Sequence, residues 1–127
     1  MIGYKRQVNL TYERAVVKVR EELAKEGFGV LTEVDVKATL KKKLDVDYEE
    51  YIILGTCNPP FAYEALQVTK EVGLMMPCNL VVFVDKGITF VETTTPTVLM
   101  NLIGDQRLKS TAEKIEAKLK KVVDSIS

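Results

Sequence analysis

The chain has 127 residues, a length typical of one domain, and 46% of them are hydrophobic, enough for a core without disulfides or a metal. Basic and acidic residues number 18 each, so the zero net charge gives no long-range attraction to nucleic acid or to an anionic membrane. Histidine is absent, which excludes Ser-His and Cys-His nucleophile pairs and His-ligated zinc. The composition therefore disfavours an enzyme.

The sequence also indicates where the protein resides. No apolar run approaches the ~20 residues that span a bilayer, and the first residues contain no apolar signal-peptide segment. Two cysteines are too few for a secreted disulfide scaffold. We expect one domain over residues 1–127 in the reducing cytoplasm, with no cofactor and with neither a nucleic-acid nor a membrane partner.

The first half of the chain predicts alternating strands and helices. Some alternation of apolar residues favours a short strand over residues 4–10. Apolar residues at helical spacing follow over residues 14–25, and Gly27 is suited to end that helix. β-Branched and aromatic residues predict a second strand over residues 28–36. A short helix over residues 35–43 completes this half.

The middle of the chain predicts a strand, a helix and a hairpin. Residues 51–57 form a continuous apolar run, which is typical of a central strand covered on both faces. Asn58 and Pro59 favour a helix start, as N-cap and first helical residue, and Gly73 is suited to end the helix. Strands over 79–84 and 88–94 are joined by a turn that contains glycine.

A long amphipathic helix closes the chain. Its apolar residues recur at steps of three and four, which places them on one stripe that we expect to pack on the sheet. The order of elements predicts an α+β fold with one sheet of about five strands, helices on one face and this C-terminal helix. The stripe comprises Leu108, Ala112, Ile115, Leu119, Val122 and Ile126.

Two segments resemble the signature of domain-of-unknown-function family 302. That signature reads as a strand, Gly-x-Cys-Asn-Pro, a helix, Gly-Leu-Leu-Leu-Pro-Cys-Asn and another strand. The resemblance implies a TATA-binding-protein-like α+β fold with a curved, mostly antiparallel sheet, and it implies neither DNA binding nor a particular activity. The segments are residues 53–66, ILGTCNPPFAYEAL, and residues 73–83, GLMMPCNLVVF.

Cys57 and Cys78 allow three interpretations. They could form a redox pair or a soft-metal site with Met75 or Met76, Cys57 could be a single reactive thiol, or both could be small buried hydrophobic residues. In a simple crossover the intervening helix runs back along the sheet. We therefore expect the two thiols at opposite ends, farther apart than a disulfide allows, unless the connector over residues 74–77 returns.

The Cys57-Asn58-Pro59 segment is the best candidate for a site. The helix that starts there directs free amides and partial positive charge toward Cys57, so a small anion could bind, although a purely structural cap explains the same residues. The candidate ligand-binding residues are Cys57, Asn58, Pro59, Phe61, Pro77 and Cys78, of which Cys57 and Cys78 are the metal candidates.

Three functions remain open at this stage. The first is a non-enzymatic domain that binds or senses a small ligand, near the Cys57 helix start or between sheet and C-terminal helix. The second is a protein that handles thiols or soft metals through Cys57 and Cys78. The third is a homo-oligomeric assembly module. Because one face or edge of such a sheet is left uncovered, we expect a homodimer.

Overall fold

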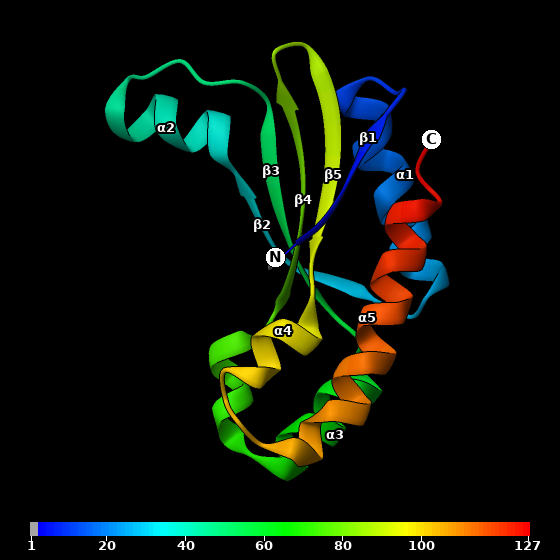
Figure 1. Ribbon diagram of the computed structural model, residues 1–127. Helices are drawn as coiled ribbons and strands as arrows, with labels where there is room; N and C mark the ends of the chain where they lie inside the picture. Colours follow the sequence, from blue (N-terminus) through cyan, green and yellow to red (C-terminus); the bar gives the residue numbers. More distant parts are fainter. Residues whose placement is uncertain (1–2) are drawn as a thin grey trace.

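The computed structural model describes residues 3–127, which form one five-stranded antiparallel sheet with helices. The strand order is β1-β5-β4-β3-β2, so the α+β prediction is confirmed (Figure 1). The strands are β1 Gly3–Val8, β2 Gly29–Asp35, β3 Tyr51–Cys57, β4 Cys78–Asp85 and β5 Ile88–Thr94. The α-helices are α1 Tyr12–Lys25, α2 Val36–Leu44, α3 Pro59–Val68, α4 Pro96–Asn101 and α5 Lys109–Asp124, and the 3-10 helices are η1 Lys70–Met75 and η2 Gln106–Leu108.

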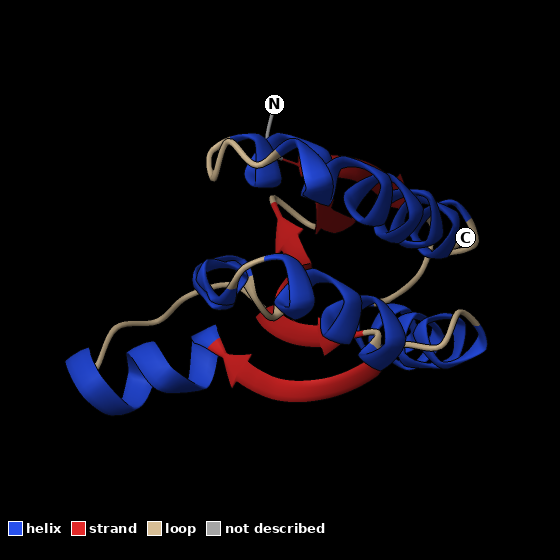
Figure 2. Cartoon of the chain, turned by 90° about the horizontal axis from the view of Figure 1, so that it is seen from below, coloured by secondary structure: helices blue, strands red, loops and turns tan. Residues whose placement is uncertain are grey.

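The main core lies between one face of the sheet and the pair α1 and α5. These two helices lie together on one side of the strands, whereas α2 extends away beyond β3 (Figures 1 and 2). Every second residue of the inner strands points into this core. The core includes Ala15, Val19 and Leu23 from α1, Leu54, Leu80, Val82 and Val91 from the sheet, and Leu119, Val122 and Val123 from α5.

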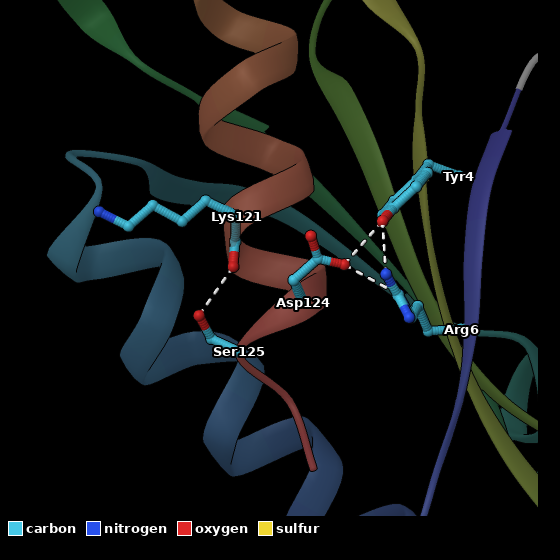
Figure 3. A network of polar contacts seen from close by, with 5 residues as sticks. All are labelled: Tyr4, Arg6, Lys121, Asp124 and Ser125. Carbon is cyan, nitrogen blue, oxygen red and sulfur yellow. Dashed lines mark hydrogen bonds and ion pairs between the residues drawn. The ribbon is translucent and has the colours of Figure 1, made fainter.

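The C-terminal helix packs as its stripe predicted. Ile115 and Leu119 are buried, with 6% and 0% of their surface exposed. Polar contacts fix the end of α5 on β1: the Tyr4 hydroxyl donates to Asp124 Oδ1 at 2.7 Å and Arg6 Nε donates to the same oxygen at 2.8 Å (Figure 3). Both ends of the described chain are therefore tied to each other.

A second, smaller core lies at one end of the sheet, where α3, η1, α4 and α5 meet. Its charged contacts are organised around Glu116, whose carboxylate accepts from the Thr97 amide at 3.1 Å and the Thr97 hydroxyl at 2.7 Å. Burial acts to raise the pKa of Glu116, but the bonds from Thr97 and the nearby Lys120 ammonium outweigh it and lower the pKa. The buried members are Ala65, Val72, Met100, Leu108 and Ala112.

Two predictions about the elements were wrong, and one helix was not predicted. The middle strand is β4, and Tyr51 and Ile53 of β3 are partly exposed, so β3 is covered on one face only. The helix expected to run to Gly73 ends at Val68 and is followed by η1. The sequence analysis also did not anticipate α4, because its six residues are too few to show a helical period.

The β4–β5 hairpin follows its turn chemistry. Lys86 and Gly87 have φ values of 52° and 81°, the left-handed conformation that a two-residue hairpin turn requires. Within residues 3–127 no helix is long and apolar enough to cross a membrane.

Candidate functional site

The two cysteines lie at the same end of the sheet, so the expectation that they would be far apart was wrong. Thr56 pairs with Cys78 across β3 and β4, which makes Cys57 the next residue along β3. The chain returns because α3 has only ten residues and the 3-10 turn η1 brings it back to the start of β4. Both cysteines carry free thiols.

A cavity of about 270 Å³ opens beside the two cysteines. It lies at the boundary between the two cores, because its wall takes residues from both of them. The wall contains no charged side chain. Its members are Phe28, Leu31, Thr56, Cys57, Asn58, Ala62, Ala65, Gly73, Met76, Pro77, Cys78, Met100 and Ile115.

Sulfur is concentrated in this wall. Both cysteines of the chain and two of its four methionines, Met76 and Met100, line the cavity. Met75, which the sequence offered as an alternative to Met76, does not. Among residues 3–127 no three acidic, cysteine or histidine side chains gather in a way that could hold a metal ion. Any coordination here would have to include thioethers.

The wall has two polar side chains without sulfur, Thr56 and Asn58, and both form hydrogen bonds. The Thr56 hydroxyl donates to the Cys78 carbonyl at 2.9 Å. Asn58 occupies the N-cap position of α3 but makes no side-chain cap bond, contrary to the prediction. Its amide instead donates to the carbonyl of Glu26 at 3.1 Å, which ties α3 to the end of α1. A capping bond is disfavoured because an N-cap side chain binds the amide of the second or third helical residue, and Pro60, the second, has no amide hydrogen.

Pro77 forms part of the wall because Gly55 leaves room for it. A Cβ atom on Gly55 would lie 2.7 Å from Pro77 Cγ and would also overlap the Thr32 hydroxyl. Glycine is not needed at this position for a turn or for a positive φ, because Gly55 lies within β3. The glycine therefore sets how closely the segment before β4 approaches the sheet.

Leu31 lies at the mouth of the cavity. The β2–β3 register shifts between Val30 and Thr32, so Leu31 is the extra residue of a β-bulge. The bulge leaves Leu31 66% exposed although its side chain lines an apolar hollow. An exposed leucine at this place offers an apolar contact to a ligand that enters.

Two of the candidate residues lie outside the wall. Pro59 is exposed at the start of α3, and Phe61 packs against the main core. The other four candidates, Cys57, Asn58, Pro77 and Cys78, all line the cavity.

Other wall residues, notably Met100 and Ala65, were not among the predicted site residues. Met100 belongs to the unanticipated α4, so no pattern pointed to it. Ala62 and Ala65 of α3 are three residues apart and share one helix face. This face of small side chains is the sequence signal that could have located the cavity.

The thiol of Cys78 is partly buried and packs against the main core. Burial raises the pKa of Cys78 to about 11, and the neighbouring Cys57 adds to the shift. Cys78 is therefore a neutral thiol near pH 7, which suits a wall without charge.

A larger hollow of about 640 Å³ lies between α4 and α5. Its wall carries charges of both signs, and two of its carboxylates are paired, Asp105 with Arg107 and Glu116 with Lys120. The smaller cavity is the better candidate site because its sulfur atoms are not engaged in this way.

Comparison with known proteins agrees with the resemblance seen in the sequence. The family model described as "Domain of unknown function DUF302" matches residues 4–126. The crystal structure of an uncharacterized conserved protein DUF302 from Bacillus stearothermophilus is 34% identical in sequence and superimposes with a TM-score of 0.92, covering 98% of this chain and 97% of that one. No curated protein matches the chain.

Proposed function

The chain belongs to the DUF302 family, and we propose that this member binds a small ligand in the cavity beside Cys57 and Cys78. The observation that carries the proposal is a hollow whose wall contains no charged side chain. Its volume of about 270 Å³ lies just below the roughly 300–1,000 Å³ of common ligand sites, which favours a small ligand. Because burial of an unpaired charge is unfavourable, the bound form should carry no net charge.

The role that fits this site is non-enzymatic binding or sensing. A ligand held between α3, α5 and the sheet end would join the two cores that meet there. Its occupancy would then stabilise the arrangement of the two cores by mass action. We place this role in the cytoplasm, where free thiols persist in the reduced state.

Titration with N-phenyl-1-naphthylamine, an uncharged dye that fluoresces in apolar surroundings, tests the proposal. The chain has no tryptophan, so its own emission interferes little. We expect saturable binding of one dye that Ala62→Phe abolishes by filling the cavity. Leu66→Phe is the matched control, because Leu66 is on the same helix, 40% exposed and outside the wall. Equal binding by both variants would contradict the proposal.

Native mass spectrometry of protein purified from its own source gives the identity of the ligand. A retained mass that Ala62→Phe no longer carries is the expected result. Retention of the same mass by that variant would place the ligand elsewhere on the molecule.

We also propose a homodimer, formed through the sheet face opposite α1 and α5. Tyr51, Phe83 and Phe90 form a partly exposed aromatic row there, with ring centroids 5.2 and 5.4 Å apart. Lys5 and Glu92 flank the row as directly opposed residues of β1 and β5. The patch therefore carries an apolar row with one positive and one negative side chain beside it, and a second copy of the same patch can meet it across a twofold axis.

Sedimentation equilibrium tests the dimer. We expect twice the 14.3 kDa of one chain, and a single chain mass for Phe83→Glu. Val17→Glu is the control, because Val17 is exposed on α1 away from this face. A monomeric wild-type protein at high concentration would refute the proposal.

A further inference from the structure

We infer that the ligand of the cavity is a cuprous ion, Cu(I), held by the thioethers of Met76 and Met100 and by one thiolate of Cys57 or Cys78. The inference rests on the proposed function, since it names the ligand class of the same site. It starts from the concentration of sulfur in one uncharged wall.

Ligand chemistry favours a soft ion. Thiolates and thioethers prefer Cu(I), whereas carboxylates and carbonyls suit Mg²⁺, Ca²⁺ and Mn²⁺. The two oxygen-bearing side chains of the wall, Thr56 and Asn58, already make hydrogen bonds. The sulfur atoms are therefore the side-chain donors of this wall for which no hydrogen bond is found.

The set of donors discriminates against zinc. Structural zinc sites take four ligands, usually cysteine thiolates and histidines. The wall offers two thiols, and the chain contains no histidine. Thioethers bind zinc poorly but complete the coordination of Cu(I).

Charge balance selects a single thiolate. When Cu(I) binds, one thiol releases its proton to solvent, a sulfur–copper bond forms and copper remains in the +1 state. One thiolate and one cuprous ion sum to zero charge, which suits this cavity. A second thiolate would leave a negative charge that no lysine or arginine of the wall could pair.

The second cysteine can then replace the first as the thiolate ligand. Because Cys57 and Cys78 both line the cavity, either one can receive the ion while the other stays protonated. We expect each single Cys→Ser variant to keep the ion and the double variant to lose it.

Anaerobic titration with Cu(I), in competition with the chromogenic chelator bicinchoninate, tests the inference. The wild-type protein should withdraw one equivalent of copper from the chelator. Met76→Leu combined with Met100→Leu conserves the packed volume and should weaken binding at least tenfold. Met75→Leu is the matched control, because Met75 adjoins Met76 in sequence and lies outside the wall, and it should bind as the wild type does.

Parallel measurements separate the inference from the proposed function. Saturation with Cu(I) should displace the naphthylamine dye. Zn²⁺ should neither bind in the cavity nor displace the dye. Dye binding without copper retention, or equal copper affinity in the double methionine variant, overturns the copper assignment and leaves the ligand cavity standing. If the folded wild-type protein binds neither the dye nor copper, both the proposed function and the copper assignment are wrong. Circular dichroism checks that each variant is folded.

Discussion

Gly55→Ala tests the packing that shapes the cavity. The added Cβ would overlap the Thr32 hydroxyl and would lie 2.7 Å from Pro77 Cγ, whereas nonbonded carbon atoms are most favourable at roughly 3.5–4.0 Å. The proline ring would have to move by about 1 Å, or β3 would have to bend. Overpacking of this kind destabilises by ~1–3 kcal/mol.

Gly73→Ala is the matched control. No atom lies within 4 Å of a Cβ built on Gly73, and this residue does not have a positive φ. Both substitutions reduce the conformational entropy of the unfolded chain by a similar amount, worth ~0.4–1 kcal/mol of stability. That contribution cancels when the two variants are compared. Gly55→Ala should therefore unfold at a free energy ~1–3 kcal/mol below that of Gly73→Ala.

Urea denaturation followed by circular dichroism gives both free energies. At a slope of about 2 kcal/mol per molar urea, the two midpoints should differ by about 0.5–1.5 M. Dye binding should also weaken in Gly55→Ala, because Pro77 is part of the wall. If Gly55→Ala were as stable as Gly73→Ala, the close approach of Pro77 and Thr32 to Gly55 would not matter, and the account of this packing would be refuted.

Three further experiments examine the site and its support. Leu31→Ser should lower dye affinity at least threefold while changing stability by less than about 0.5 kcal/mol, because Leu31 is exposed at the mouth; an unchanged affinity would remove it from the site. Glu116→Gln should lower the unfolding free energy by ~1 kcal/mol at pH 7. Since the folded state lowers the pKa of Glu116, this stabilisation is complete above the usual glutamate pKa of about 4.3 and is lost as pH falls from there through the lower pKa of the folded state. The difference from wild type should therefore narrow at acid pH, and a constant difference would contradict the linkage. Iodoacetamide should label Cys57 faster than Cys78 in the native protein at pH 8, because a pKa of about 11 leaves only ~0.1% of Cys78 as thiolate; peptide mass analysis showing the reverse order would contradict the argument.

The sequence predicted the elements whose local signals agree with their packing. The stripe through Ile115 and Leu119 has a helical period, and both residues are buried. The hairpin needed a residue with positive φ, and Gly87 supplied it. In these cases local propensity and tertiary packing favour the same structure, which is why they could be found without coordinates.

The distance between the cysteines could not be predicted in the same way. It depends on where the chain turns after α3, and residues 70–75 have no strong period of their own. A crossover helix would have separated the thiols by the length of the sheet, whereas the short α3 and the η1 turn bring them together. Asn58 failed as a cap for a related reason: its amide binds the Glu26 carbonyl, a partner 32 residues away that no local motif reveals.

The small residues around the cavity bear on why the hollow exists. The hollow opens to solvent beside Leu31, so it leaves unpacked some apolar wall surface that a filled core would bury. Larger side chains at Ala62 or Ala65 would fill the space from α3, a remedy available to any protein that needs only to fold. Alanines at these two places instead leave the hollow open. We therefore interpret the hollow, which lies at the junction of the two cores and is lined by most of the chain's sulfur, as a site for an occupant.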